Sequence, residues 1–194
     1  GLDKEKGAFR LHAAGETFSA QRVISTIPIT RAQALIGMEP DSGLRTVTMI
    51  SLFYSFAGAR NFAQSVLFNF SHAGGWKRLT MHSDFYGRES GREYFGVEVN
   101  ASPEIASVED AARDFRAHTV ENGIFAGDLR LEGSHALSSA YPIYTSGAAA
   151  RAGRAMANLR AFGVESFGRQ GGFDYQPTAR VSTIEAEQRL ADPS

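Results

Sequence analysis

The residues best suited to holding a cofactor lie near the C-terminal end of the sequence. Gly168 and Gly171 flank Arg169, and glycines let a backbone approach a flat or phosphorylated ligand closely. Pro177 then opens a predicted helix, whose N-terminal N–H groups and partial positive charge attract a negatively charged group. Arg169 and Arg180 add side chains that form charge-assisted hydrogen bonds with phosphate. The same residues also fit a glycine-rich turn between a strand and a helix, without any ligand.

Other patterns that carry chemistry are absent from the sequence. No Gly-x-Gly-x-x-Gly follows an early strand, and neither a phosphate-binding loop of the Gly-Lys-Ser/Thr type nor a Gly-x-Ser-x-Gly elbow occurs. The five histidines fall in separate segments without metal-ligand spacing, and there is no cysteine. Thiolate zinc sites, thiol nucleophiles and disulfides are therefore excluded, and we expect no metal site. The chain alone has no standard cradle for a dinucleotide pyrophosphate.

The bulk composition is that of an ordinary globular protein. The chain has 194 residues, of which 43% are hydrophobic and 21% charged, and its formal net charge is -1. This balance argues against a nucleic-acid-binding protein, which would need a basic stripe, and the sequence offers no polybasic membrane patch. No apolar run approaches the roughly 20 residues that a membrane-spanning helix needs. We therefore expect no transmembrane segment and, with no cysteine, a cytoplasmic protein.

Residues of high β propensity predict the sheet that must position these groups. Val, Ile, Thr and aromatic residues gather in short runs that end at glycine or proline. Strands are expected over 9–13, 22–27, 44–56, 64–70, 76–85, 93–100, 129–144 and 164–167. The four strands between 44 and 100 follow one another closely, which favours an antiparallel meander.

Helix signals separate and follow these strands. Ser107, with Glu109 and Asp110 after it, is typical of a capped helix start with an acidic first turn. Thr30 is expected to cap a shorter helix in the same way. Helices are predicted over 31–36, 107–122, 148–162 and about 177–190, with a tight loop over 168–172.

Three segments together resemble a known group of flavoproteins. The run Ala-Tyr-Pro-Ile-Tyr at 140–144 and the run Phe-Gly-Arg-Gln-Gly-Gly-Phe-Asp-Tyr at 167–175 resemble the closing segment of the amine oxidase and protoporphyrinogen oxidase superfamily. They are also similar to UDP-galactopyranose mutase. Upstream, Arg-Val-Ile-Ser-Thr-Ile-Pro at 22–28 resembles the strand by which those proteins leave the FAD domain for the substrate domain. The order of the segments matches along nearly the whole chain.

The resemblance implies which residues contact FAD. Gly168 and Arg169 would meet the pyrophosphate or ribityl chain, and the start of the last helix would face the pyrimidine edge of the flavin, where negative charge develops on reduction. The implied cofactor-binding residues are Thr26, Pro28, Gly168, Arg169, Gly171, Phe173, Tyr175, Thr178, Ala179 and Arg180.

The sequence departs from the family pattern at the last helix. Many relatives have an Asn-Asn or Tyr-Asp pair after the aromatic residue and then an aspartate in the first turn, where this chain has Gln-Pro-Thr-Ala at 176–179. A small residue further along that helix is Glu185 here. These departures disfavour the mutase branch.

Side chains of the sheet and of the returning strand are predicted to bind the substrate. They are Trp76, Arg78, Tyr141 and Tyr144. Arg78 follows Trp76 at i+2 and is expected on the same strand face, where an anion can lie beside an indole. Each aromatic residue also fits ordinary packing within a sheet.

We therefore predict an α+β chain in which a mainly antiparallel substrate-domain sheet is flanked by pieces of an FAD-binding domain. FAD-domain strands are expected in 1–29, a substrate-binding domain in 30–139, and a return to the FAD domain in 140–194. The predicted function is that of the C-terminal portion of a flavin-dependent oxidoreductase, which transfers hydride from a small-molecule substrate to FAD. The partner would be the dinucleotide-binding N-terminal part, and the isolated chain is expected to be inactive. Two alternatives remain: a nucleotide-sugar mutase-like flavoprotein and a non-catalytic excised domain.

Overall fold

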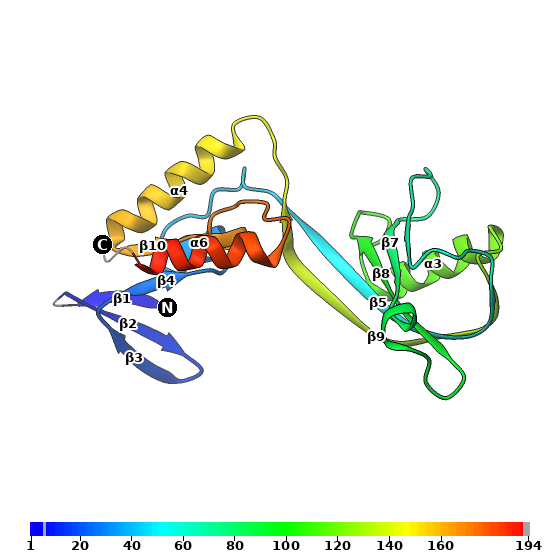
Figure 1. The fold of residues 1–194 in the computed structure, drawn as a ribbon. Coiled ribbons are helices and arrows are strands. Elements are labelled where there is room, and N and C mark those ends of the chain that lie inside the picture. The colour runs from blue at the N-terminus through cyan, green and yellow to red at the C-terminus, as the bar shows by residue number, and fades with distance from the viewer. Residues whose placement is uncertain (6, 192–194) are drawn as a thin grey trace. The chain divides into compact units, whose positions relative to one another are not determined.

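The chain forms two compact units, which a computed structural model describes for residues 1–5 and 7–191. The first unit combines Gly1–Thr46 with Ser139–Ser194, and the second is Val47–Ser138 (Figure 1). Helices alternate with strands in the second half of the chain, and the larger sheet is antiparallel. The predicted α+β class is confirmed.

Two small sheets belong to the first unit. Strands β1 (Leu2–Glu5), β2 (Ala8–Ala13) and β3 (Glu16–Ala20) form an antiparallel sheet in that order. Strands β4 (Val23–Ser25) and β10 (Val164–Ser166) pair in parallel. The strand predicted over 22–27 is therefore shorter than expected, because only three of its residues find partners in β10.

Four helices complete the described part of the first unit: α1 (Ile29–Leu35), α4 (Ala148–Phe162), α5 (Gly168–Gly171) and α6 (Ala179–Ala191). The buried residues of α4 lie three or four positions apart and form one apolar stripe that packs with α1. They are Ala148, Ala152, Ala155 and Leu159. The N-cap of α1 is Pro28 without a side-chain cap, so the prediction that Thr30 caps this helix is wrong. The residues predicted as a tight loop include the single turn of α5.

The second unit is built on a five-stranded sheet whose strand order is β6-β7-β8-β5-β9. The bounds are β5 Thr46–Arg60, β6 Val66–Phe68, β7 Trp76–Met81, β8 Glu93–Asn100 and β9 Phe125–Pro142. The predicted antiparallel meander is confirmed for β6, β7 and β8 but is wrong for β5, which pairs with β8 and lies beside β9 rather than beside β6. Strand spacing along the chain does not determine which edges pair.

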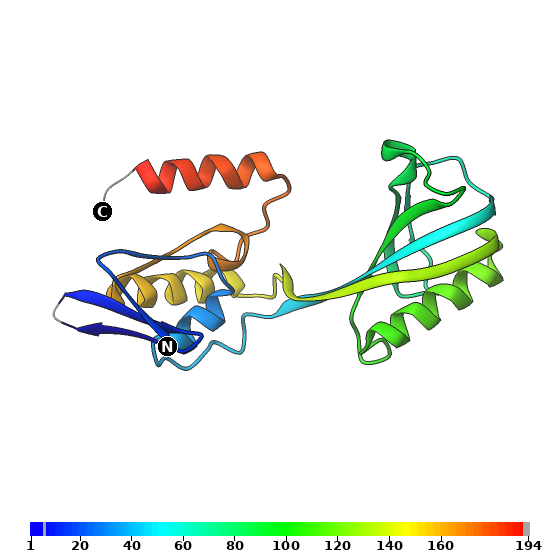
Figure 2. The same cartoon turned by 90° about the horizontal axis from the view of Figure 1, so that it is seen from below.

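One face of this sheet is covered by α3 (Val108–Glu121) (Figure 2). Ser107 caps α3 in a full capping box with Asp110, as the sequence predicts. Tyr54 and Phe95 stack with ring centroids 5.4 Å apart, and Phe115 of α3 lies 5.2 Å from Tyr54. Burial raises the pKa of Tyr54 to about 12. The core of the second unit is thus a layer of aromatic rings between sheet and helix.

β5 and β9 approach each other closely at a pair of glycines. A Cβ atom on Gly58 would lie 2.2 Å from the carbonyl oxygen of Ala126, and one on Gly127 would lie 2.2 Å from that of Ala57. Both glycines have positive φ, 149° and 146°, where a side chain is strained. Glycine is therefore required at both positions.

Candidate functional site

The glycine-arginine segment forms a corner where the parallel strand β10 ends and α5 begins. Gly168 has a φ of 82°, a left-handed conformation that glycine adopts without strain. No atom lies within 4 Å of the position that its Cβ would occupy. The Ser166 hydroxyl donates to the Gly171 carbonyl at 2.8 Å and closes the corner. Gly168 therefore leaves one side of the backbone open to an approaching group.

Gly171 lies against the protein's own backbone. It is buried, and a Cβ there would lie 2.6 Å from the Ser25 carbonyl oxygen and 3.2 Å from the Cα of Thr26. The missing side chain lets α5 pack on the end of β4. The two family-like segments at 22–28 and 167–175 are thus brought into direct contact, and Gly171 is needed for that contact.

Arg169 lies beside a pair of tyrosines whose ring centroids are 6.0 Å apart. Its guanidinium carbon lies 5.3 Å from the ring centroid of Tyr141 and 5.4 Å from that of Tyr175, distances at which a cation is attracted to an aromatic face. The guanidinium also donates to the carbonyl oxygen of Gln176. Arg169 is therefore oriented by contacts within its own chain, namely the rings of Tyr141 and Tyr175 and the Gln176 carbonyl.

The remaining aromatic residues of the corner divide into a buried and an exposed group. Phe173 is buried in the core of the first unit and meets the Tyr144 ring edge-on at 6.3 Å. Its φ of 52° is unusual for a residue with a side chain. The Tyr144 hydroxyl accepts the backbone N–H of Tyr175 at 2.7 Å. Tyr144 and Tyr175 are both half-exposed, so these two rings, unlike Phe173, offer area to a ligand.

The start of α6 is organised by Gln176, which sequence reasoning missed as a structural residue. Gln176 is only 2% exposed. Its side-chain oxygen accepts from Ser182 at 2.6 Å, and its side-chain nitrogen donates to Glu185. Thr178 accepts the backbone N–H of Val181 at 3.3 Å. The departures from the family pattern at Gln176 and Glu185 are therefore joined by a hydrogen bond.

A small cavity lies behind this corner. Its volume is about 10 Å³, which is close to the space that one water molecule needs. Pro28, Thr46 and Gln170 are among the lining residues. This cavity is too small for a flavin ring, so any cofactor site at the corner must use an exposed surface. Of the predicted cofactor-binding residues, Thr26, Thr178, Ala179 and Arg180 are exposed.

In the second unit, Trp76 and Arg78 lie on opposite faces of the sheet, and the prediction that they share a face is wrong. Trp76 pairs with Val99 but Arg78 pairs with Glu98, because a β-bulge lies between them. Trp76 is 4% exposed, and its indole N–H donates to Nδ1 of His118 at 3.0 Å. Trp76 therefore packs in the core, whereas Arg78 forms an ion pair with Glu98 on the other face.

Within residues 1–5 and 7–191, no three or more His, Asp or Glu side chains gather so as to hold a metal ion. The helices described there are too short or too polar to cross a membrane.

Comparison with known proteins gives structural matches. No protein-family model and no curated protein sequence matches the chain. A reduced UDP-galactopyranose mutase superposes with a TM-score of 0.69, covering 85% of this chain and 38% of its own, at 16% identity. A protein described as a protoporphyrinogen oxidase from Exiguobacterium gives a TM-score of 0.66, covering 98% of this chain and 46% of its own, at 16% identity. The chain shares the fold of these enzymes.

A third match widens the range of activities on this fold. A fatty acid isomerase from P. acnes that produces CLA gives a TM-score of 0.54, covering 84% of this chain and 40% of its own, at 9% identity. The resemblance seen in the sequence is thus confirmed at the level of fold. The chain spans less than half the length of each of these proteins.

Proposed function

We propose that this chain is the C-terminal portion of an FAD-dependent oxidoreductase. The observation that carries the proposal is the match over 98% of the chain to the protein described as a protoporphyrinogen oxidase. Fold alone does not fix an activity, so the corner at Gly168 is the second support. Its open glycine, its two half-exposed tyrosines and the adjacent helix start fit one side of a flavin site.

The proposal gives each unit a role. In the first unit, Gly168 lets the cofactor approach the backbone, Arg169 adds positive charge, and the start of α6 at Thr178 faces the flavin. When bound, FAD supplies the acceptor for a hydride taken from the substrate. The second unit presents the face of its sheet opposite α3 to the substrate. The pyrophosphate cradle comes from a dinucleotide-binding part that this chain does not contain.

The decisive experiment uses two matched glycine variants in the longest natural form of the protein. Gly168→Ala points a methyl group into the proposed cofactor space, and Gly15→Ala is its control. Gly15 has the same φ of 82° and likewise nothing within 4 Å of its Cβ position, so both variants carry a similar backbone strain of about 1–2 kcal/mol. We expect Gly168→Ala alone to weaken FAD binding at least about tenfold, or ~1.4 kcal/mol.

FAD binding is measured by titration of the apoprotein and by the absorption spectrum of the purified protein. Equal FAD affinity in the two variants would show that the corner at Gly168 does not contact the cofactor. A natural protein that purifies without colour and ignores added FAD would support a non-catalytic role instead.

The second candidate function is a nucleotide-sugar mutase, which the match to the reduced mutase favours. A mutase of this kind needs positive charge for the sugar diphosphate, and Arg78 and Arg169 are the candidates. Both already have partners in this chain: Arg78 pairs with Glu98, and Arg169 contacts two tyrosines and the Gln176 carbonyl. Spectral titration of the reduced protein with a UDP-sugar separates the two functions, since only the mutase is expected to respond.

A further inference from the structure

An open hollow of about 410 Å³ lies in the second unit beside α2 (Ser83–Tyr86). Its volume falls within the range of small-molecule sites, roughly 300–1,000 Å³. His82, Tyr86, Arg88, Glu89 and Tyr94 contribute side chains to its wall. The hollow therefore combines two phenol rings and an imidazole with only one arginine.

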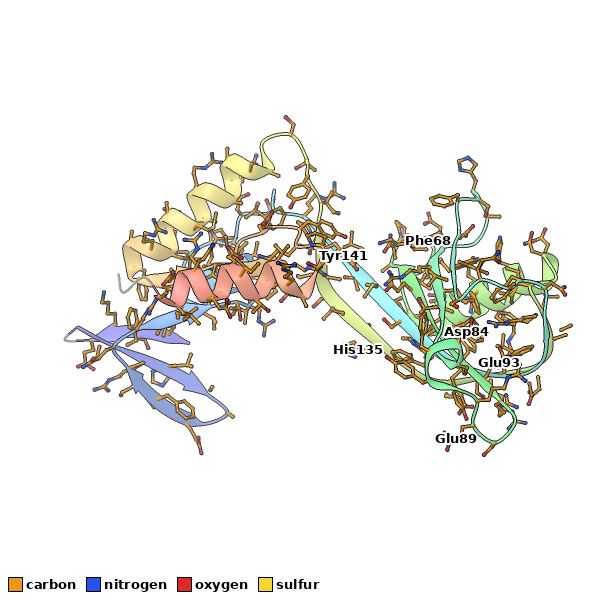
Figure 3. The ribbon with its side chains drawn as sticks, viewed as in Figure 1. Phe68, Asp84, Glu89, Glu93, His135 and Tyr141 are labelled. Carbon is orange, nitrogen blue, oxygen red and sulfur yellow. The ribbon has the colours of Figure 1, made fainter. Side chains whose placement is uncertain are left out.

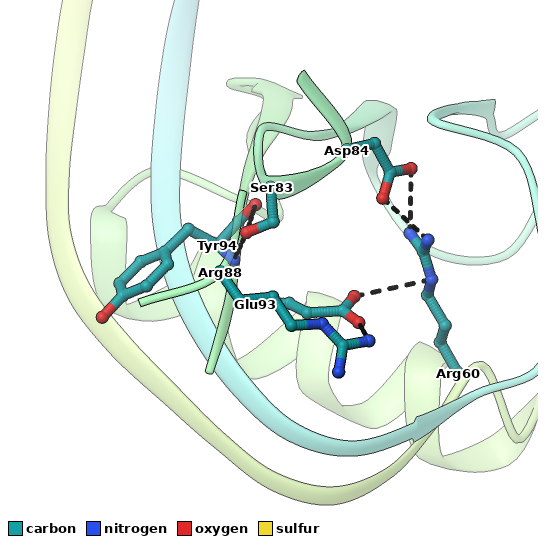
Figure 4. A network of polar contacts seen from close by, with 6 residues as sticks. All are labelled: Arg60, Ser83, Asp84, Arg88, Glu93 and Tyr94. Atoms are coloured by element: carbon teal, nitrogen blue, oxygen red, sulfur yellow. Dashed lines mark hydrogen bonds and ion pairs between the residues drawn. The ribbon is translucent and has the colours of Figure 1, made fainter. Parts of the chain in front are cut away.

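Backbone contacts fix the two tyrosine-bearing walls relative to each other. The Ser83 hydroxyl accepts the backbone N–H of Tyr94 and donates to its carbonyl oxygen at 3.4 Å. These bonds attach α2 directly to β8, and the Tyr94 ring points away from the charged groups behind it (Figure 4). Gly87 ends α2 with a φ of 89°. This backbone conformation, which glycine adopts without strain, changes the direction of the chain just before Arg88.

Ion pairs also join the elements that line the hollow. Arg60 contacts both carboxylate oxygens of Asp84 at 2.8 and 3.2 Å, and its Nε lies 3.5 Å from Glu93. Glu93, with a side chain 8% exposed, also pairs with Arg88. Asp84 and Glu93 lie near each other in Figure 3. A partly buried bidentate pair of this kind orients groups more strongly than an exposed pair does.

The arginines at and behind the hollow are already paired with carboxylates. Arg60 and Arg88 are both paired, with Asp84 and Glu93 as their partners. Glu89 adds a further carboxylate to the wall. An anionic ligand would have to compete with Glu93 and Glu89 for the one arginine of the wall, whereas an uncharged ring can stack on the phenols without disturbing the ion pair.

We propose that this hollow binds an uncharged, planar aromatic molecule between Tyr86 and Tyr94, with His82 available for a hydrogen bond. If the second unit is the substrate-binding part of an oxidoreductase, as proposed above, the hollow selects aromatic substrates over nucleotide sugars. Tyr86 is the principal binding residue, because the residue is 86% exposed and its side chain loses little existing packing when a ligand binds.

The test uses the 194-residue chain and three probes, followed by amide chemical shifts in two-dimensional NMR. Naphthol is the uncharged aromatic probe, naphthoate carries the same rings with a negative charge, and UDP represents the nucleotide part of a nucleotide sugar. Tyr86→Ala removes the exposed ring, and Phe18→Ala is the control because Phe18 is a 51% exposed aromatic residue of β3 in the first unit. Neither residue is part of a core, so both variants are expected to fold.

We expect naphthol to shift amides around 82–94 saturably and to bind at least about tenfold more tightly than naphthoate or UDP. Tyr86→Ala is expected to weaken naphthol binding about tenfold, whereas Phe18→Ala leaves it unchanged. The proposal is overturned if naphthol gives no saturable shifts there, if either anion binds more tightly, or if Tyr86→Ala binds like the control. Because the assay needs no flavin, its result does not depend on whether the natural protein binds FAD.

Discussion

Replacing His118 by leucine tests whether the buried hydrogen bond from Trp76 stabilises the second unit. Leucine is close in size to histidine but accepts no hydrogen bond. The change therefore leaves the indole N–H of Trp76 buried without a partner, in a core where Trp76 is 4% and His118 9% exposed. The edge-on ring contact between them, with centroids 5.8 Å apart, is lost as well.

A buried donor left without an acceptor costs about 1–3 kcal/mol. We therefore expect His118→Leu to lower the free energy of unfolding by about 2 kcal/mol, which reduces the ratio of folded to unfolded protein roughly 30-fold. With a urea dependence of about 1–3 kcal/mol/M for small domains, the urea midpoint should fall by roughly 1 M.

The assay is urea unfolding followed by tryptophan fluorescence, since Trp76 is the single tryptophan of the chain. His135→Leu is the control because His135 is exposed on β9 of the same unit, and an exposed substitution normally changes stability by less than about 0.5 kcal/mol. In the double variant with Trp76→Phe, followed by circular dichroism, the loss should be smaller than the sum of the single losses, because no unpaired donor remains. Equal midpoints for His118→Leu and His135→Leu would refute the reasoning.

Two further predictions concern the second unit. Hydrogen bonds from Arg60 lower the pKa of Asp84. The Asp84 carboxyl group therefore binds a proton less tightly in the folded state than in the unfolded state. The stability that this difference gives is present above the ordinary carboxyl pKa of about 4 and is lost as the pH falls below it. Asp84→Asn should therefore reduce the fall in urea midpoint between about pH 5 and pH 3, and an unchanged fall would contradict this origin. Gly127→Ala should destabilise the unit by more than about 3 kcal/mol, because its Cβ meets a carbonyl oxygen at 2.2 Å. Gly133→Ala, with nothing within 4 Å, should leave the thermal midpoint nearly unchanged, and similar midpoints for the two variants would contradict the prediction.

Elements with strong local signals are predictable from the sequence. The bounds of α4 and β8 agree with the structure at 148–162 and 93–100. Alanine-rich periodicity and an alternating apolar pattern need no distant partner to be recognised. The capping box at Ser107 is equally local, since its two hydrogen bonds join residues three positions apart.

Features that depend on distant partners were not predictable in the same way. The β-bulge at Lys77 separates the faces of Trp76 and Arg78, and it is defined by pairing with β8 rather than by the strand itself. The role of Gly171 depends on Ser25, which lies far away in the sequence. The Arg60–Asp84–Glu93 network likewise joins three separate elements, so the sequence could identify its charges but not their pairing.

The helix α6 has a consequence for how the first unit responds to binding. None of its thirteen residues is buried, and polar contacts attach it to the rest of the first unit: Ser182 and Glu185 bond to Gln176, and the Arg189 carbonyl accepts from Arg22. A segment of this length is marginally helical in water when nothing covers it. A partner that packed on α6 would therefore supply part of the free energy that keeps it helical, and binding would be coupled to the ordering of this segment.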